Sequence, residues 1–325
     1  MSTTSKSPRK VALVALAVAE QSLSTYSHRF SPKTFTQPQL FACLAVKTFF
    51  RTDYRGVTAI LADMPELCQT IALVKVPHFT TLQKAARRLM ASVVSKKLLE
   101  ATISQALGHK PRVELAAVDS TGMESHHISQ YFVRRRASTS SPWRSMFYTR
   151  YPKLGVVCDC QSHIILSTLR KRGPTPDINQ LDQTVRPAVG RSQINALLAD
   201  AGYDYEANHK LAREELGIET VIPARHGRPS NRPPAGKYRR LMREEFDKER
   251  YGQRWQVETV FSMIKRNLGS ALHGRSYWSQ CRELMLLAIT HNIMIVMPVE
   301  LFYRAVLTPF PPYPFSPPDP FSPSY

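Results

Sequence analysis

Residues 112–120 read RVELAAVDS, a short run of β-type residues that ends near the acid Asp119. Two more predicted strands follow in KLGVVCDCQSHIILSTLRK, residues 153–171, and a tight turn near 159–162 joins them. Strand and helix then alternate: a helix after Asp177, the strand INALLAD at 194–200, the helix YEANHKLAREELG at 205–217 and the strand ETVIPA at 219–224. Three strands in series followed by this alternation predict an α/β fold, a mixed sheet with helices on its faces.

The region before these strands, 37–107, has a helical pattern. Its candidate helices are QPQLFACLAVKTFF (37–50), YRGVTAILAD (54–63), PELCQTIAL (65–73) and a long helix that opens at Thr80. Thr80 and Gln83, three residues apart, have the form of a capping box. The turns that follow carry Lys84, Arg87 and Arg88, which is compatible with a helix-turn-helix-like reader of DNA. A helical cap with ordinary basic surface residues explains the pattern equally well.

Composition indicates the kind of partner. The 325 residues include 44 Lys plus Arg against 25 Asp plus Glu, a net charge of +19 with a pI near 10.0. This balance favours a polyanion, and nucleic acid fits better than an anionic membrane. The hydrophobic content of 43% is ample for a buried core. Five cysteines at scattered positions indicate neither a disulfide framework nor a paired CxxC metal site, as expected in a reducing cytoplasm.

Two apolar stretches raise the question of a membrane or an export signal. SPRKVALVALAVAE near the N-terminus resembles a secretory signal, but an N-terminal packing helix explains the same residues. LMLLAITHNIMIVMPVELF, 284–302, is interrupted by polar residues and a proline, which favours a buried helix over a membrane span. We therefore expect a cytoplasmic, nucleoid-associated protein.

Two acids stand at the ends of predicted strands. Asp119 closes ELAAVD, and Asp200 closes ALLAD just before Gly202. The carboxyl ends of strands are where open α/β sheets build their sites. Each aspartate could instead form a turn or cap a helix, as DSTG and DAGYD permit.

A third acid lies in YGQRWQVETVFSMIKRNLG, residues 251–269. On one α-helix, Tyr251, Arg254, Glu258 and Lys265 would fall within an arc of roughly 60°. A second face would carry five apolar residues for docking on a core, namely Trp255, Val257, Val260, Phe261 and Ile264. The simpler alternative is a solvated stripe with an Arg254–Glu258 pair one turn apart.

Three gathered carboxylates repel one another unless cations bind between them. Mg²⁺ prefers oxygen ligands and is usually held by a few carboxylates together with substrate phosphate. Two such ions can activate the attacking oxygen and stabilise the leaving oxygen at phosphorus. If Asp119, Asp200 and Glu258 converge, they would form a site for cutting phosphodiesters.

AVDSTG, ADAGYD and the Tyr-x2-Arg-x3-Glu-x6-Lys pattern of 251–265 closely resemble the DDE transposases of bacterial and archaeal insertion sequences, whose catalytic core is RNase H-like. The resemblance runs from about residue 37 to 297. It also includes DYRGVTAILADMPELCQ, VPHFTTLQKAARRL, GPTPDINQLD and LAITHNIM. The stretch between Asp200 and Glu258 is too short for the large β-rich insertion domain of some relatives.

The resemblance implies that Asp119, Asp200 and Glu258 are a metal-binding catalytic triad. Tyr251, Arg254 and Lys265 would flank it, with the cations near DNA phosphates. It implies two Mg²⁺ ions, with Mn²⁺ as an accepted substitute, that serve cleavage at the element ends and transfer of the 3′-hydroxyl into target DNA. The implied partners are terminal inverted repeats, target DNA and further copies in a dimer or larger synaptic complex, with no membrane and no small-molecule substrate. The alternatives are a nuclease of the same fold without strand transfer and a non-catalytic DNA-binding protein derived from a transposase.

Two basic stretches suggest where DNA lies. The first, 125–158, contains Arg134, Arg135, Arg136 and Lys153 among aromatic residues, and the second is 225–243. Such mixtures suit a surface that follows a nucleic-acid backbone, although a solubilising basic loop explains them as well.

Other polar residues have structural explanations that we favour. Asp177 fits the N-cap of a helix better than a fourth ligand, and Asp204 fits the cap of the helix at 205–217. Packing explains the group of Cys158, Cys160 and His163 better than zinc does.

The expected organisation has four parts. Residues 1–36 form a basic, partly ordered segment, and 37–110 a helical region that could bind DNA. Residues 111–303 form the RNase H-like core, and 304–325 a proline-rich disordered tail.

Overall fold

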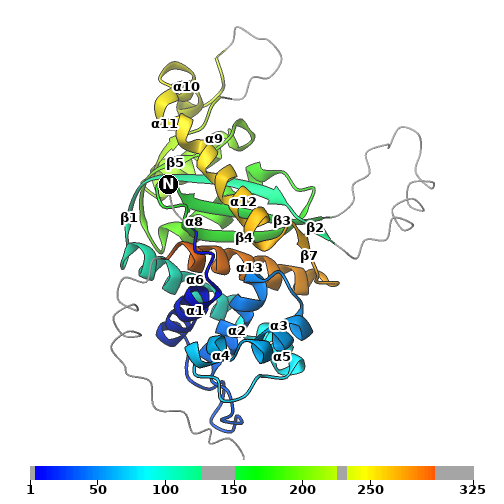
Figure 1. Ribbon diagram of the computed structural model, residues 1–325. Helices are drawn as coiled ribbons and strands as arrows, with labels where there is room; N and C mark the ends of the chain where they lie inside the picture. The colour runs from blue at the N-terminus through cyan, green and yellow to red at the C-terminus, as the bar shows by residue number, and fades with distance from the viewer. Residues whose placement is uncertain (1–3, 126–150, 225–232, 297–325) are drawn as a thin grey trace, which may run out of the picture.

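The computed structural model describes residues 4–125, 151–224 and 233–296, and within them one five-stranded mixed sheet lies next to a group of helices (Figure 1). The strands are β1 (Arg112–Gly122), β3 (Tyr151–Asp159), β4 (Ile165–Gly173), β5 (Gln193–Leu198) and β6 (Glu219–Val221). Their order across the sheet is β4-β3-β1-β5-β6. β3 is antiparallel to both β1 and β4, whereas β1, β5 and β6 run parallel. This order is that of an RNase H-like sheet, so the expected fold class is confirmed.

Helices cover both faces of the sheet. Ser167 of β4 donates to the Thr184 carbonyl in α8 (Leu181–Val189), while the next residue, Thr168, contacts Met285 of α13 (Tyr277–Ile295). Successive side chains of a strand point to opposite faces, so α8 and α13 lie on opposite sides. α12 (Trp255–Leu268) packs on β1 and β3 and also against α13. This double cover explains why β3 is buried almost throughout.

The shorter elements complete the chain. They are β2 (Glu124–Ser125), which pairs with β7 (Ala271–Leu272), the 3₁₀ turns Asp177–Asn179, Ala201–Tyr203 and Gly252–Arg254, and the helices α9 (Glu206–Lys210), α10 (Lys237–Glu244) and α11 (Lys248–Tyr251). α9 continues as a π-helical turn over Leu211–Glu215, within the helix predicted for 205–217.

The region before the sheet is helical, as predicted. It comprises α1 (Pro8–Ser22), α2 (Gln37–Phe49), α3 (Tyr54–Asp63), α4 (Pro65–Thr70), α5 (Phe79–Leu89) and α6 (Ser92–Leu107). The apolar N-terminal run that resembled a signal forms α1, which packs on α2, α4, α6 and α13.

The long helix predicted from Thr80 is wrong in two respects. Its N-cap is His78, whose ring accepts from the Thr80 backbone N–H and also contacts the Thr80 hydroxyl at 2.8 Å. The helix then stops at Leu89, because Ala91 is extended and serves as the N-cap of the separate helix α6. The Thr80–Gln83 pattern therefore lies inside the first turn and does not start the helix.

α13 joins the two parts of the molecule. It contacts α1, α2, α5 and α6 on one side and β3 and β4 on the other, and it runs between the N-terminal helices and the sheet (Figure 1). Every residue from Leu284 to Ile295 is buried. The predicted buried helix in 284–302 is therefore confirmed over Leu284–Ile295, and residues 297–302 lie outside the described residues. In the described part of the chain, no helix is long and apolar enough to cross a membrane.

One buried amide ties α13 to the edge strand. The Asn292 side chain accepts from the Ile165 backbone N–H at 2.8 Å and donates to the Ile165 carbonyl at 3.0 Å. It also donates to the Thr102 hydroxyl of α6 at 2.9 Å. Asn292 is completely buried, so a single side chain satisfies three polar groups that water cannot reach.

We expect Asn292→Ala to lower the free energy of unfolding by about 2–4 kcal/mol, because it leaves both polar groups of Ile165 unsatisfied. The matched control is Thr290→Val, two residues earlier on the same buried helix. The Thr290 hydroxyl has no hydrogen-bond partner among the described residues, so its removal should be neutral or slightly stabilising. Urea denaturation of both variants measures the difference, and equal losses would contradict this account.

Candidate active site

The parallel register of β1 and β5 places Asp119 and Asp200 at the same level of the sheet. The last paired residues are Ala117 and Leu198, and each aspartate follows two positions later on its own chain. Asp119 still lies within β1, where it is opposite Val156 of β3. Asp200 has left its strand, and its Oδ1 accepts from the Gly202 backbone N–H at 2.9 Å. Asp200 therefore caps a turn and also lies beside Asp119.

The surroundings of Asp119 disfavour its negative charge. Burial raises the pKa of this carboxyl to about 6, and the nearby charges of Asp200 and Asp177 act in the same direction. The Ser120 backbone N–H, which donates to Asp119 at 2.7 Å, and the Arg254 guanidinium oppose the rise in pKa. A carboxylate held in this way gains from any cation that binds next to it.

Arg254 connects Asp119 to Glu258. Its Nη1 lies 3.6 Å from Asp119 Oδ2, and its Nη2 lies 2.5 Å from Glu258 Oε1. Glu258 is in the first turn of α12, one helical turn after Arg254. The width of one guanidinium therefore separates the first and third predicted acids.

The segment 251–265 is not the single helix that the sequence predicted. α11 ends at Tyr251, a 3₁₀ turn covers Gly252–Arg254, and α12 begins at Trp255. Tyr251 packs against Phe246, with ring centroids 5.0 Å apart. Trp255 is 53% exposed, so its assignment to the apolar face is wrong, because the face turns where the 3₁₀ turn gives way to α12. The other four apolar residues of that face are buried as expected.

Lys265 contacts β1 and is not part of a purely solvent-exposed helix face. Its ammonium donates to the Thr121 hydroxyl at 2.8 Å, two residues after Asp119. Arg254, Glu258 and Lys265 therefore approach the end of β1, whereas Tyr251 contacts Phe246.

Asp177 is a fourth acid at this edge and not the helix cap that the sequence suggested. The 3₁₀ turn Asp177–Asn179 has Pro176 at its N-cap position, with no side-chain cap. The Asp177 carboxylate accepts from the Ser120 hydroxyl at 2.9 Å and pairs with Lys153 at 2.7 Å. Lys153 is buried, so it neutralises Asp177 and is not part of a DNA-facing surface. The sequence contained a sign of this pair: Lys153 stands within a nearly continuous apolar strand, and a buried lysine requires an acidic partner.

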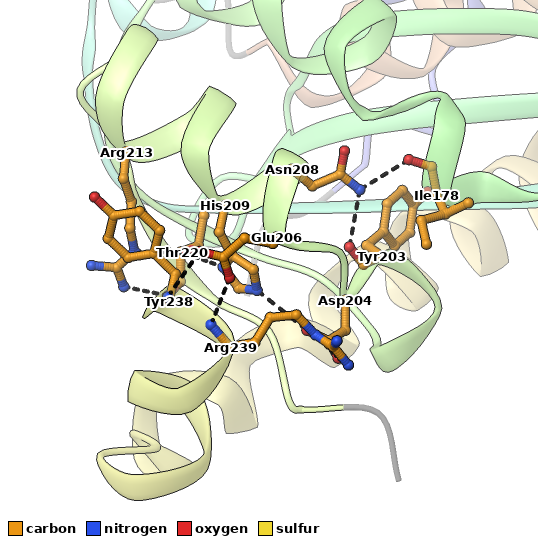
Figure 2. Close-up of polar contacts among 10 residues, drawn as sticks. All are labelled: Ile178, Tyr203, Asp204, Glu206, Asn208, His209, Arg213, Thr220, Tyr238 and Arg239. Atoms are coloured by element: carbon orange, nitrogen blue, oxygen red, sulfur yellow. Dashed lines mark hydrogen bonds and ion pairs between the residues drawn. The ribbon is translucent and has the colours of Figure 1, made fainter. Parts of the chain in front are cut away.

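Asp204 also differs from the expected helix cap, because the N-cap of α9 is Tyr205. Its side chain is fully buried and forms a bidentate pair with Arg239, in which Nε lies 3.0 Å from Oδ1 and Nη2 lies 2.8 Å from Oδ2. His209 Nε2 lies 3.4 Å from Asp204 Oδ1, and His209 Nδ1 lies 2.8 Å from the Thr220 hydroxyl of β6 (Figure 2).

The same network holds the start of α10. The Glu206 carboxylate accepts from the backbone N–H groups of Tyr238 and Arg239, both at 3.2 Å (Figure 2). α10 leads through α11 into the turn that carries Arg254. The acid four residues after Asp200 therefore positions the chain that reaches the candidate site from the other side.

The donor set determines whether a metal ion fits. No group of three His, Cys, Asp or Glu side chains within the described ranges could hold a metal ion as they stand, and this includes Cys158, Cys160 and His163. At the candidate site, the Arg254 guanidinium lies between two of the three carboxylates. Burial raises the pKa of Asp119, so a further cation beside this carboxylate would be favourable, and its oxygens are of the type that Mg²⁺ prefers. The donor chemistry therefore suits a divalent cation, whereas in the arrangement of these side chains Arg254 occupies the place between Asp119 and Glu258.

Some of the predicted DNA-binding cations lie within the described residues. Lys84, Arg87 and Arg88 are exposed on α5, and Arg88 also donates to the Gln37 side chain at 3.2 Å. Arg134, Arg135 and Arg136 lie outside the described residues.

Comparison with known proteins gives a family and a structural likeness. The family model described as "Transposase DDE domain" matches residues 111–293, from the start of β1 to near the end of α13. A crystal structure of a pre-cleavage Mos1 transpososome is similar over 85% of this chain and 83% of that chain, with 12% sequence identity and a TM-score of 0.22. Among curated proteins nothing matches.

The metal-free protein should become less stable as the pH rises from about 4 to above 6. A raised pKa means that the stability Asp119 contributes is complete below its unfolded value, 3.8, and is lost as the pH passes through about 6. Asp119→Asn removes this loss, so at pH 7.5 in EDTA the variant should be more stable than the wild type by about 1–3 kcal/mol. Thermal unfolding at pH 4 and 7.5 tests this, and a difference that does not depend on pH would refute it.

Asp204→Asn should destabilise the protein by about 3 kcal/mol, because it leaves Arg239 partly buried beside a neutral side chain. Amide hydrogen exchange should also increase across 237–254. Glu214→Gln is the matched control: Glu214 accepts from the Tyr238 hydroxyl in the same region but is exposed. We expect it to change stability by less than about 0.5 kcal/mol. Equal effects of the two substitutions would show that the Asp204 network does not hold α10.

Proposed function

Because this chain belongs to the family of DDE-domain transposases, we propose that it is a DNA transposase with Asp119, Asp200 and Glu258 as catalytic acids. It would cleave phosphodiester bonds at the ends of an insertion sequence and join the 3′-hydroxyls to target DNA. The observation that carries the proposal is the convergence of the acids: Asp119 within β1 and Asp200 just after β5 lie at one level of two adjacent parallel strands, and Arg254 links Glu258 to Asp119.

Asp119, Asp200 and Glu258 would together hold Mg²⁺, or Mn²⁺ in its place. Bound there, the ions would supply a Lewis acid for the scissile phosphate and lower the pKa of the attacking water or hydroxyl. The burial of Asp119 keeps bulk water from screening this charge, which strengthens its hold on a cation. Asp177 is already neutralised by Lys153, so it is better suited to orient Ser120 beside Asp119 than to bind metal.

The cations of the signature have separate tasks in this proposal. Arg254 neutralises Asp119 and Glu258 in the metal-free protein and becomes available to a DNA phosphate when divalent cations take over that task. Its planar guanidinium matches a phosphate as well as a carboxylate. Lys265 is held by Thr121 close to the end of β1 and would place a positive charge next to the same DNA strand. Tyr251 would contribute to DNA binding through its hydroxyl, with its ring fixed on Phe246.

The partners would be the terminal inverted repeats and target DNA, with two or more copies of the chain in a synaptic complex. The exposed cations of α5 and the arginines at 134–136 would contact DNA. The chain would then divide its tasks between a DNA-binding helical region (37–110) and a catalytic core (111–303). Two ends have to be cut and joined together, which is the reason to expect more than one copy.

Incubating the protein with labelled end-sequence DNA, a target plasmid and Mg²⁺ tests the proposal. A transposase gives covalently joined products, a nuclease of the same fold gives cut ends only, and a non-catalytic binder leaves the DNA intact. The end sequence would be taken from short inverted repeats that bracket the coding region.

Glu258→Gln should reduce cleavage by at least about 100-fold, because a ligand charge at the reacting phosphate stabilises the transition state by several kcal/mol. DNA binding in EDTA should persist, measured by fluorescence anisotropy on the same DNA. Glu244→Gln, an exposed acid on α10, should cleave like the wild type. A Glu258→Gln variant with normal cleavage would exclude Glu258 from the catalytic set.

A further inference from the structure

A basic pocket with an exposed aromatic side chain lies between the N-terminal helices and the core. Its volume is about 250 Å³, and it is lined by the end of α5, the α5–α6 turn, strand β4 and the first turns of α13. Three arginines come from three different elements: Arg87 from α5, Arg170 from β4 and Arg282 from α13. No acid lines the pocket. The candidate active site shares none of these residues.

The three guanidiniums need an anion. Within the described ranges, none of Arg87, Arg170 and Arg282 has an acidic partner, although other exposed arginines of this chain are paired, such as Arg186 with Asp182 and Glu215. Like charges that line one small hollow repel one another, and an anion between them removes this cost. A planar guanidinium donates to phosphate oxygens in a matched pair, so a phosphate group is the natural occupant.

Aromatic rings stand at the same pocket. Trp278 lines it and is 70% exposed, which is unusual for the largest apolar side chain. Tyr277 is already engaged, because Arg172 stacks on its ring at 4.4 Å and its hydroxyl donates to the Arg170 carbonyl. Tyr277 therefore fixes the wall, whereas Trp278 leaves a face to solvent. An aromatic face beside a phosphate site is the arrangement that binds nucleotide bases by stacking.

The register of the sheet places this pocket at the end where the catalytic acids lie. Arg170 is opposite Leu154 of β3, and Leu154 is opposite Thr121 of β1, two residues beyond Asp119. Two strand spacings separate Arg170 from Thr121, roughly 10 Å across the sheet. Arg170 has the same parity along β4 as Thr168, which contacts α13, so it faces the side that α12 and α13 cover. Arg170 and the catalytic edge therefore lie on the same face of the sheet, a short distance apart across the strands.

We propose that this pocket is a DNA-binding subsite, which holds one backbone phosphate between Arg87, Arg170 and Arg282 and stacks an adjacent base on Trp278. The inference rests on the proposed transposase function. In this proposal Arg87 belongs to a site that α5 forms together with the core. An independent DNA-binding helix would use Arg87 without any contribution from the core. Because the pocket requires α5 and α13 together, DNA bound there would hold the helical region and the core in one arrangement.

The experiment measures binding of the full-length protein to a fluorescein-labelled DNA duplex with a single-stranded extension, in EDTA, between about 50 and 200 mM NaCl. Arg170→Gln/Arg282→Gln should weaken binding by about 10-fold at the lower salt concentration and reduce the slope of log K against log salt by about 1. Trp278→Ala should weaken binding by about 5- to 100-fold with the slope unchanged, because stacking releases no counterions. Trp278→Phe should retain most of the DNA affinity that Trp278→Ala loses.

The control is Lys75→Gln/Lys210→Gln, which removes the same charge from exposed positions outside the pocket and should leave both the affinity and the slope near wild type. Circular dichroism melting identifies any variant that fails to fold, and the Trp278→Ala/Trp278→Phe comparison then carries the test. Wild-type affinity and slope in Arg170→Gln/Arg282→Gln would overturn the proposal.

The outcome separates this inference from the proposed function. If the wild-type protein neither binds nor cleaves DNA, the transposase proposal fails and the pocket loses its ligand with it. If the wild type binds and cleaves while the pocket variants behave identically, only the pocket assignment fails.

Discussion

The parallel register between β1 and β5 is the constraint on which the candidate site depends. A shift of one residue would turn either aspartate to the opposite face of the sheet, and a shift of two would separate them along the strands. The apolar cores of the two strands fix this register, because Ala116, Ala117 and Leu198 are completely buried. Packing energy thus holds together two carboxylates that would otherwise repel each other. Burial is the main cause of the raised pKa of Asp119, and the charge of Asp200 adds to it.

Four of the acids near this edge, Asp119, Glu258, Asp177 and Asp204, contact a cation, and the contacts differ in kind. Lys153 is buried against Asp177, and Arg239 grips the buried Asp204 in a bidentate pair, so both act as fixed parts of the fold. Arg254 is different, because one guanidinium is shared between Asp119 and the exposed Glu258 at unequal distances. A shared cation at the solvent edge is the easiest to displace, which is why this position suits a site that exchanges its own cation for metal ions and DNA.

Much of this arrangement could be predicted from the sequence, and the failures have physical reasons. The strands follow from local patterns of apolar residues, and so does the position of Asp200 just after β5. Asp119 does not end its strand as predicted, because β1 continues to Gly122. The break between Tyr251 and Trp255 does not, because a 3₁₀ turn keeps helical spacing while it changes which face a residue occupies. The Lys153–Asp177 and Asp204–Arg239 pairs join segments 24 and 35 residues apart, and only the folded sheet brings them together. Local capping patterns competed for the same aspartates and gave the wrong assignment.

The helical region and the sheet share one continuous hydrophobic core, which limits how independently they can work. α13 is buried on both sides, so moving the helical region away would expose apolar surface along most of this helix. Asn292 adds a polar constraint, since the same amide bonds to α6 and to β4. A DNA-binding module on a flexible linker could reach its target without regard to the catalytic edge. Here the cations of α5 lie in a fixed position relative to Asp119, so DNA bound by the helices would enter the candidate site in a defined orientation.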